Sequence, residues 1–353
     1  MAMKDYYIMS GDTAVAKWEN SELTVLNEAL LPLYLRRVHN ADMWLETRAI
    51  DSHRANSRLL KKALRLEEKD DLSTVIHVNG ATITDNYWVK ELDSSLEYAD
   101  IRFSNDYFSM LALRGSYDDF DSAARRNNTR TPELTNIGSF EKCWKLKDGK
   151  WWLVKTANHN EQFSEMFIYK FGEALGMNMA VYERGRNTIK SLDFTDSASV
   201  NFEPAFTFMG DNDNYEAVIA KLQEICPQAI PDYVRMIFLD TIVANPDRHT
   251  ANFGLLRDTK TGELLGLAPL FDHNMALISR KPPKIRTSSD AFMNLFLNVQ
   301  FHHADYKQYI PVVTPEIIKD TLDNLHMRVK KQFIIDLIMN RYVLSVGKVK
   351  PLF

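Results

Sequence analysis

The chain has little cysteine and no long hydrophobic run. Its two cysteines, Cys143 and Cys226, are too few for a disulfide framework or a Cys-rich zinc site. No apolar run approaches the roughly 18–20 residues that span a bilayer. The N-terminal segment has an acidic residue at Asp5 and no apolar stretch typical of a secretory signal. We therefore expect a protein of the reducing cytoplasm that does not act at membranes.

An excess of charge of one sign is also absent. The 353 residues include 43 Lys and Arg and 47 Asp and Glu, for a formal net charge of −4, so we expect no direct nucleic-acid binding. Two small basic segments, residues 125–126 and 281–286, are interpreted as solvated loops. Hydrophobic residues make up 45% and charged residues 25% of the chain, which predicts a globular protein with two or three structural units.

Local patterns in the first third predict a mixed α/β region. Residues 5–18 alternate and turn through residues 10–12, which predicts a hairpin. Apolar residues at mixed three- and four-residue spacing predict two helices within residues 31–66. The polar stretch 115–133 has no strong periodicity and indicates a boundary. Residues 1–130 are therefore expected to form an N-terminal accessory region.

The next part of the chain predicts a hairpin followed by a helix. Two short apolar runs, residues 143–146 and 151–155, flank an Asp-Gly pair, which is a strong signal for a tight hairpin turn. Large apolar residues then recur at every fourth position, and the pattern stops at Gly176: Phe163, Phe167, Phe171 and Leu175. This spacing predicts a helix with a glycine terminator.

The remaining elements are expected to be strands first and helices later. Residues 181–194 and 200–208 are interpreted as a strand pair. Residues 231–245 start on a proline and end before Pro246, which predicts a helix, and residues 315–345 also have a helical pattern.

Three residues in the second half carry the clearest chemical pattern. Asp247 and Asn252 are five positions apart, and Asp272 follows an apolar strand expected over residues 264–270. Phosphoryl transfer explains such a set, because one carboxylate orients the attacking hydroxyl while an amide oxygen and a second carboxylate hold magnesium. Asp and Asn are also common in turns and caps. The ordered sequence of helix, loop, strand and aspartate favours the catalytic interpretation.

This loop resembles that of the HipA-type serine/threonine kinases, whose pattern is N-x-D-x-H-x-x-N. The matching residues are Asn245, Asp247, His249 and Asn252. The Asp-Arg-His-Thr-Ala-Asn segment is also similar to the D-R-H-x-x-N loop of phosphoinositide kinases. The resemblance implies ATP and Mg²⁺ as cofactors, Asp247 as the base and His249 as a loop-ordering residue.

The same resemblance implies an α+β, two-lobed protein-kinase-like fold. We expect a small antiparallel β-rich N-lobe over residues 131–205 and a mainly helical C-lobe over residues 206–353, preceded by the mixed α/β accessory region 1–130. The segment TDNYWVK, residues 84–90 of that region, is similar to a pattern of uncharacterised role in HipA-like chains.

A kinase of this kind also needs a strand lysine and a helix acid to hold it. Lys155 ends the apolar run WWLVK, and Glu165 lies ten residues later on the predicted helix. Taken singly, a snorkelling strand-edge lysine and a solvated glutamate are the better explanation of these residues. Given the downstream loop, we predict a Lys155–Glu165 ion pair, with Glu161 as the competing partner.

The segment over residues 135–142 resembles the phosphate-binding loop of the HipA family, with its G-x-x-x-K core. Gly138 and Lys142 match the core and Ser139 lies between them. Backbone amides of such a loop cradle phosphate oxygens, and a glycine permits their close approach. A plain strand connection is the alternative. HipA-type kinases can autophosphorylate a loop serine, but that position aligns here with Thr135, so self-inhibition stays open.

The adenine is expected against the connection between the lobes, at the turn over residues 190–194, which includes Ser191 and Asp193. Backbone groups are expected to make those contacts. The leading hypothesis is transfer of the ATP γ-phosphate to Ser or Thr of a protein substrate. A kinase of a small molecule or lipid headgroup, or a catalytically dead nucleotide-binding module, are the alternatives. The resemblance also implies a toxin-like role with an antitoxin-like regulatory partner.

Overall fold

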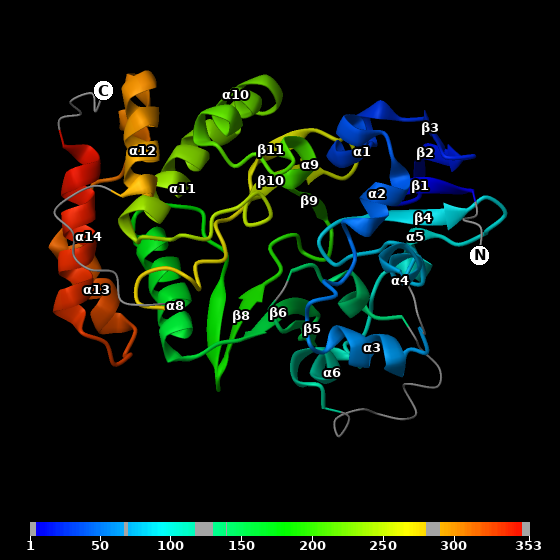
Figure 1. Cartoon of the computed structure of the whole chain (residues 1–353), viewed down its shortest axis with the longest axis horizontal. Coiled ribbons are helices and arrows are strands. Elements are labelled where there is room, and N and C mark those ends of the chain that lie inside the picture. The colour runs from blue at the N-terminus through cyan, green and yellow to red at the C-terminus, as the bar shows by residue number, and fades with distance from the viewer. Residues whose placement is uncertain (1–4, 67–69, 117–129, 139, 280–289, 348–353) are drawn as a thin grey trace. The chain divides into compact units, whose positions relative to one another are not determined.

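The computed structural model describes residues 5–66, 70–116, 130–138, 140–279 and 290–347 (Figure 1). It is a mixed α/β protein with several antiparallel strand pairs. Ser139 and the two basic segments, 125–126 and 281–286, lie outside the described residues.

The chain divides into two compact units, each made of three chain segments. Unit 1 comprises Met1–Thr156, Lys190–Glu203 and Leu256–Glu263. Unit 2 comprises Ala157–Ile189, Pro204–Leu255 and Leu264–Phe353. The three-part division at residues 130 and 205 stays a prediction.

The first chain segment of unit 1 contains short helices and strands that pair antiparallel with one another. Its elements are β1 (Tyr6–Ser10), β2 (Thr13–Glu19), β3 (Glu22–Val25), η1 (Glu28–Leu30), α1 (Leu33–Val38), α2 (Ala41–Glu46), α3 (Ser57–Ala63), α4 (Asp71–Ile76), β4 (Tyr87–Glu91), α5 (Tyr98–Ile101), α6 (Ser109–Arg114), η2 (Pro132–Thr135), β5 (Lys142–Lys147) and β6 (Lys150–Thr156).

The later elements are α8 (His159–Ala174), β7 (Tyr182–Gly185), β8 (Thr188–Leu192), β9 (Val200–Pro204), α9 (Phe206–Met209), α10 (Tyr215–Ile225), η3 (Pro227–Ala229), α11 (Ile230–Ile242), β10 (Gly254–Asp258), β11 (Leu264–Leu267), α12 (Ala291–His302), η4 (Ala304–Tyr309), α13 (Pro315–Asn324) and α14 (Lys331–Val346). The sheet orders are β3-β2-β1-β4, β5-β6-β8-β7 and β11-β10-β9.

The hairpin expected over residues 5–18 is confirmed as the antiparallel pair β1 and β2. Strand β4 also pairs antiparallel with β1, with Ile8 opposite Val89. The TDNYWVK segment therefore supplies an edge strand of this sheet, and its Trp88 is fully buried.

Of the two helices expected within residues 31–66, the second is confirmed by α3, whereas the first is wrong, because α1 and α2 take its place. Helix α1 ends at His39, whose φ of 57° is left-handed. The side chain of Asn40 then accepts a hydrogen bond from the N–H of Met43 and caps the next helix. A left-handed residue followed by an N-cap breaks the helical run that the apolar spacing suggested.

The Asp-Gly hairpin is confirmed by β5 and β6, which pair antiparallel with Lys147 opposite Lys150. Asp148 and Gly149 connect them with φ values of 52° and 74°, as a tight hairpin turn requires. The register continues to the other end of the hairpin, where Lys142 lies directly opposite Lys155.

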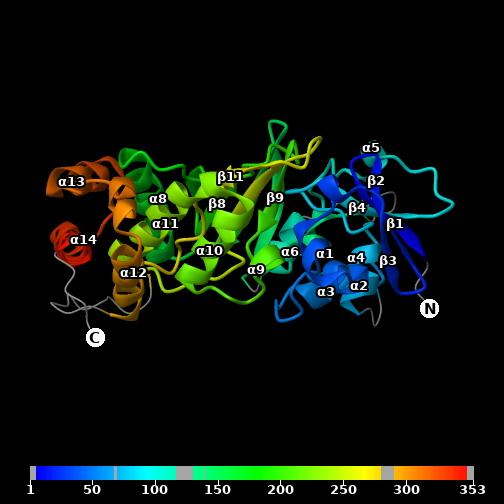
Figure 2. The same ribbon diagram turned by 90° about the horizontal axis from the view of Figure 1, so that it is seen from above.

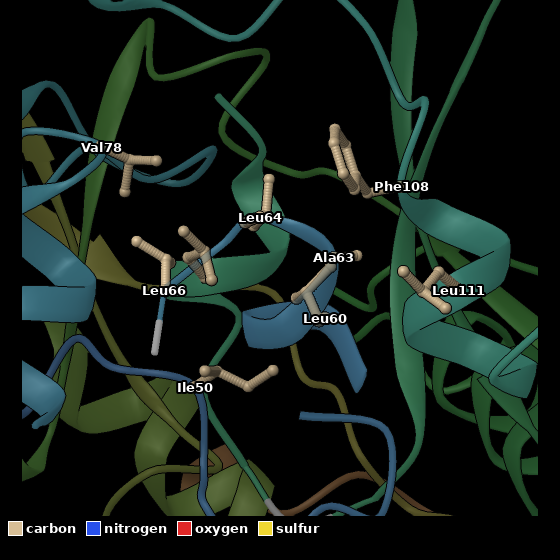
Figure 3. Packing of buried hydrophobic residues seen from close by; sticks show 9 residues of the cluster. Ile50, Leu60, Ala63, Leu64, Leu66, Val78, Phe108 and Leu111 are labelled. Carbon is tan, nitrogen blue, oxygen red and sulfur yellow. The ribbon is translucent and has the colours of Figure 1, made fainter. Parts of the chain in front are cut away.

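A hydrophobic cluster joins the helices of the N-terminal region to η2 (Figure 3). Leu60 from α3, Leu111 from α6 and Leu134 from η2 are each almost completely buried in it. The N–H of Ile50 also donates to the carbonyl of Leu134 at 2.8 Å. The segment leading into β5 is therefore packed onto residues from the first third of the chain.

A second anchor within unit 1 is the buried guanidinium of Arg257, which forms an ion pair with Glu203 at 3.0 Å. It also donates to the carbonyls of Ala29, at 2.6 Å, and Leu31, at 2.7 Å. A Cβ on Gly262 would lie 1.7 Å from the Ala29 carbonyl oxygen, so only glycine permits this close approach. These bonds attach the segment Leu256–Glu263 to the N-terminal residues.

Helices dominate unit 2. Helix α11 packs against α10, α12 and α14, and α13 packs against α8 and α14 (Figures 1 and 2). The helix expected over residues 163–175 is confirmed by α8, which is followed by Gly176 at a φ of 73°. Among the helices of the described residues, none has the length and apolar character needed to cross a membrane.

The strand pair expected over residues 181–194 and 200–208 is wrong as a pair, because β7 and β8 belong to one sheet and β9 belongs to another. Residues 181–194 contain two strands, β7 and β8, and strand β9 ends at Pro204. A short helix follows β9, with the Thr207 hydroxyl donating to the Pro204 carbonyl at 2.7 Å. Proline cannot extend a strand ladder because it has no N–H, which explains the early end.

Candidate active site

The loop after α11 is attached to its own helix through Asn245. The Asn245 side-chain N–H donates to Oδ1 of Asp240 at 2.8 Å, and its backbone N–H donates to the Asp240 carbonyl at 2.9 Å. Its side-chain oxygen accepts the N–H of Asp247 at 3.3 Å. The predicted base is therefore held at a fixed place relative to the end of the helix.

Both ends of the Asp-x-x-x-x-Asn segment meet. The Asn252 side chain donates to the carbonyl of Asp247 at 2.9 Å, and its backbone N–H donates to the carbonyl of His249 at 2.8 Å. His249 is exposed, and its Nδ1 accepts the N–H of Ala251 at 3.2 Å. These contacts suit the loop-ordering role predicted for His249, which stays a prediction.

Asp272 lies in a left-handed backbone conformation with a φ of 62°. Its backbone N–H donates to the hydroxyl of Tyr182 at 3.0 Å. Strand β11 ends earlier than the expected 264–270, and Leu270 forms an isolated parallel bridge with Met179 instead. A non-glycine residue at positive φ is costly, and such residues cluster at functional sites.

Arg248 connects the loop over residues 247–252 to the backbone next to Asp272. Its guanidinium donates to both carboxylate oxygens of Asp240, with Nε to Oδ2 at 2.7 Å and Nη2 to Oδ1 at 3.1 Å. Nη1 donates to the carbonyls of Asn252 and Phe271, and Nη2 donates to Nε2 of His273 at 2.9 Å. All five guanidinium N–H groups thus have acceptors. The buried side chain of Arg248 thus joins the segment of Asn252 to the segment of Asp272, the two candidate metal ligands.

The charge state of Arg248 is secured by its surroundings. Burial is the largest influence and lowers the pKa of Arg248, but the charge and hydrogen bonds of Asp240, together with Asp272 and Tyr182, raise the pKa above its ordinary value. Because Arg248 can only donate, Nε2 of His273 must accept, which places the proton of a neutral His273 on Nδ1.

Glu165 reaches the same cluster from α8. It is fully buried, and its Oε2 accepts the backbone N–H of His273 at 3.0 Å. The competing residue, Glu161, forms the capping box of α8 and accepts the N–H of Asn158 at 2.7 Å. The helix terminus thus engages Glu161, whereas Glu165 lies beside the residue after Asp272. The ion pair with Lys155 stays a prediction.

The sequence gives no direct indication of Tyr182, Asp240 and His273 as members of this cluster. Their partners are between 8 and 108 residues away, and such contacts leave no local pattern. One available signal was Asp240 itself, an acid inside the apolar run IFLDTIV, since a buried acid requires a partner.

The phosphate-loop candidate in unit 1 has a glycine-dependent geometry. We call residues 136–138 and 140–141 the Gly138 loop. Gly138 has a φ of 105°, and a Cβ there would lie 2.5 Å from Nζ of Lys142. Lys142 and Lys155 are cross-strand neighbours, and like charges opposite each other repel. Two cations and a glycine backbone at one end of the hairpin fit an anionic group such as a phosphate.

Thr135, which precedes this loop, has a buried hydroxyl that donates to the carbonyl of Ala81 at 2.6 Å. In the expected adenine region, the Asp193 carboxylate accepts the hydroxyl of Thr195 at 2.7 Å and the N–H of Ser197 at 2.7 Å. Asp193 therefore organises its own turn, and its backbone N–H donates to the carbonyl of Trp151. Ser191 is half-buried in β8.

Oxygen ligands suited to Mg²⁺ are present at Asn252 and Asp272. The Asn252 amide directs its nitrogen to the Asp247 carbonyl, so the nitrogen and not the oxygen faces the loop backbone. Within the part of the chain that the structure describes, no three His, Cys, Asp or Glu side chains form a metal-binding group. Mg²⁺ binds through one or two protein oxygens plus waters and substrate phosphates, which fits this pair.

Comparison with known protein families assigns the chain to one of them. The model of the HipA-like C-terminal domain matches residues 134–333. The chain belongs to this family. The HipA-like match includes the Gly138 loop, Lys155, Glu165 and the cluster around Arg248. No match to the chain is found among the curated proteins.

Two solved structures resemble the HipA-like chain. HipA of Shewanella oneidensis MR-1, from a toxin–antitoxin complex with HipB and operator DNA, covers 95% of this chain and 96% of its own at a TM-score of 0.53 and 11% identity. The Helicobacter pylori proinflammatory kinase CtkA covers 58% of this chain and 92% of its own at a TM-score of 0.42 and 16% identity. The first likeness shows a shared fold.

Proposed function

We propose that this HipA-like protein is an ATP-dependent kinase that transfers the γ-phosphoryl group to a Ser or Thr hydroxyl of a protein substrate. The observation that carries the proposal is the set of hydrogen bonds that Arg248 donates to two segments of the site. It joins the carbonyls of Asn252 and Phe271, and so connects the Asp-x-x-x-x-Asn loop with the segment of Asp272. Bases and metal ligands of phosphoryl transfer must be held in this way before substrate binds.

In this proposal Asp247 orients the acceptor hydroxyl and takes its proton. Asn252 and Asp272 hold Mg²⁺, with their backbone fixed by Arg248. Bound ATP and Mg²⁺ would supply the transferable phosphoryl group and neutralise its charge. Glu165 is a positioning residue, since it accepts the N–H of His273, the neighbour of Asp272.

Lys155, Lys142 and the Gly138 loop are proposed to bind the nucleotide phosphates. The support is the pair of lysines opposite each other beside a glycine whose φ is positive. The turn with Ser191 and Asp193 is proposed to receive the adenine through its backbone. A two-lobed kinase-like arrangement and a cytoplasmic location belong to the same proposal.

A regulatory protein partner is proposed from the fold neighbour. HipA of Shewanella oneidensis was solved with HipB as a toxin–antitoxin system, and its likeness extends over 95% of this chain. A toxin-like role with an antitoxin-like partner follows as a proposal. Autophosphorylation at Thr135 would first require its buried hydroxyl to leave the Ala81 carbonyl.

The test is incubation of the purified protein with Mg²⁺ and γ-labelled ATP, alone and with a cytoplasmic extract. We expect wild type to bind ATP and to label protein, and Asp247→Ala and Asp272→Ala to lose transfer by about 100-fold or more. Asp211→Ala, which removes an exposed carboxylate of unit 2, is the matched control and should retain activity.

Three results would each change the proposal. Equal labelling by wild type and Asp247→Ala would remove the base assignment. Label found in a soluble metabolite and not in protein would favour the small-molecule kinase. Absence of ATP binding in calorimetry would favour a nucleotide-free or catalytically dead module.

A further inference from the structure

The N-terminal region reaches the Gly138 loop through one arginine. Arg54 lies just before α3 and is 2% exposed. Its Nη1 donates to the carbonyl of Asn136 at 2.9 Å, and its Nη2 donates to the carbonyl of Lys142 at 2.5 Å. These two carbonyls flank the Gly138 loop at its beginning and its end. One rigid guanidinium therefore fixes the separation of the loop's two ends.

A second contact from the same segment holds the loop's side chain. The Asn56 amide donates to Oε2 of Glu141 at 2.9 Å, and the Asn56 backbone N–H donates to Oε1 at 3.3 Å. The same amide donates to the carbonyl of Ala112 in α6. Asn56 thus ties the C-terminal part of the loop to two helices of the N-terminal region.

The supports beneath the loop are buried and make several contacts. Glu133 is fully buried and accepts the backbone N–H of Trp144 at 2.8 Å and the side chain of Asn136 at 3.1 Å. Burial lowers the pKa of the Arg54 guanidinium, and the nearby carboxyl groups of Glu133 and Glu141 oppose that shift. Because a buried guanidinium is costly unless its charge is compensated, this arrangement indicates that the position of Arg54 is built into the fold.

We propose that Arg54 is a positioning residue for nucleotide binding, by which the N-terminal region sets the conformation of the Gly138 loop and its affinity for the phosphates of ATP. This inference rests on the proposed kinase function. It gives the N-terminal region, which carries no catalytic motif, a defined effect on the site. Planar guanidinium geometry explains the residue choice, since lysine carries a single cationic centre that cannot span two carbonyls in the same way.

The experiment compares wild type with Arg54→Ala and Arg54→Lys in the full chain. ATP and AMP binding are measured by calorimetry, transfer kinetics with γ-labelled ATP, and amide hydrogen exchange over residues 136–142. We expect Arg54→Ala to weaken ATP binding and raise the KM for ATP roughly tenfold, with kcat changed far less. AMP binding should change little, and exchange of the loop amides should accelerate.

Arg58→Ala is the matched control, because Arg58 is an exposed arginine on α3, four residues away. It should leave ATP affinity and loop exchange as in wild type. A merely structural role of Arg54 would lower ATP and AMP binding equally. Equal ATP affinity and loop exchange in the Arg54 and Arg58 variants would overturn the proposal.

Should Arg54→Ala fail to fold, Arg54→Lys and Asn56→Ala decide the same question, since each removes only part of the support. If wild type itself binds no ATP, the kinase function fails. Amide exchange of the loop then still tells whether Arg54 positions it, so the two failures are distinguishable.

Discussion

The guanidinium of Arg248 forms a bidentate ion pair with the carboxylate of Asp240, at 2.7 Å and 3.1 Å, and both side chains are about 2% exposed. Asp240 belongs to α11, whereas Arg248 lies within the loop over residues 247–252. The pair therefore attaches the loop to a buried helix. Charge-assisted bidentate bonds are among the stronger contacts in proteins, and here they also fix the direction of the remaining guanidinium donors.

Removal of Arg248 is expected to destabilise the protein strongly. Arg248→Ala leaves Asp240 buried without its counter-charge, which costs on the order of 3–5 kcal/mol of unfolding free energy. Arg248→Lys keeps a charge but not the planar fork, so it should lie between wild type and alanine. Urea denaturation followed by circular dichroism measures both.

Arg235→Ala provides the control, because Arg235 lies on α11, the helix that carries Asp240. Arg235 pairs with Asp232 at 2.9 Å, and their side chains are 37% and 40% exposed. Exposed pairs contribute about 0–1 kcal/mol, so this variant should unfold close to wild type. Equal losses in the Arg248 and Arg235 variants would show that the buried pair is no special anchor.

Asn252 variants are expected to change the magnesium requirement. Asn252→Ala removes an oxygen ligand and the bond to the Asp247 carbonyl, so the half-saturating Mg²⁺ concentration should rise, by roughly tenfold for a loss of about 1.4 kcal/mol. Asn252→Asp keeps an oxygen ligand, but it places a carboxylate oxygen against the carbonyl oxygen of Asp247, where wild type has an N–H donor. Magnesium titrations of phosphoryl transfer at fixed ATP distinguish the two variants. A normal magnesium requirement in Asn252→Ala would remove it from the ligand set.

Gly138→Ala should weaken ATP binding. The new Cβ would lie 2.5 Å from Nζ of Lys142, at a φ of 105° that side chains rarely adopt. Gly149→Ala is the matched control, because Gly149 also has a positive φ of 74° but no atom within 4 Å of the added Cβ. Calorimetry should show loss of ATP affinity only for Gly138→Ala, while both variants lose some thermal stability.

Glu133 is expected to make stability depend on pH. Burial raises the pKa of Glu133 from 4.5 to about 7. The folded state thus holds this proton more tightly than the unfolded chain does. The contribution is complete below about pH 4.5 and is lost as the pH rises through 7, with a size on the order of 3 kcal/mol.

Glu133→Gln isolates that contribution, because glutamine does not titrate. The difference in unfolding free energy between wild type and variant should shift in favour of the variant from pH 5 to pH 8. Denaturant titrations at four pH values in this range measure it. A difference that stays constant with pH would show that Glu133 keeps an ordinary pKa.

Local signals predicted the elements whose causes are local. The Asp-Gly turn gave the β5–β6 hairpin because two left-handed residues, Asp148 and Gly149, satisfy a tight turn. Helix α8 followed from its aromatic spacing and from Gly176. The first of the two helices expected over residues 31–66 is wrong because apolar spacing does not reveal the left-handed break at His39.

Only part of the candidate site could be predicted from the sequence. The spacing of Asp247, Asn252 and Asp272 is a short-range pattern, so the sequence displays it. Arg248 lies in the same motif, yet its structural role depends on Asp240 and on the backbone carbonyls of Asn252 and Phe271. Backbone acceptors have no residue signature, and they can be assigned only when the chain is folded.

The attachment of Arg257 to Ala29 and Leu31 limits how the gene can be divided. A recombinant fragment restricted to residues 134–333, the span of the family match, would retain Arg257 but lose both of those carbonyl acceptors. Its guanidinium would keep Glu203 and the Gly262 carbonyl as partners, but the hydrogen bonds that hold it to the N-terminal residues would be lost. We expect such a truncation to be insoluble. The span of the family match is therefore not expected to fold without the residues that precede it.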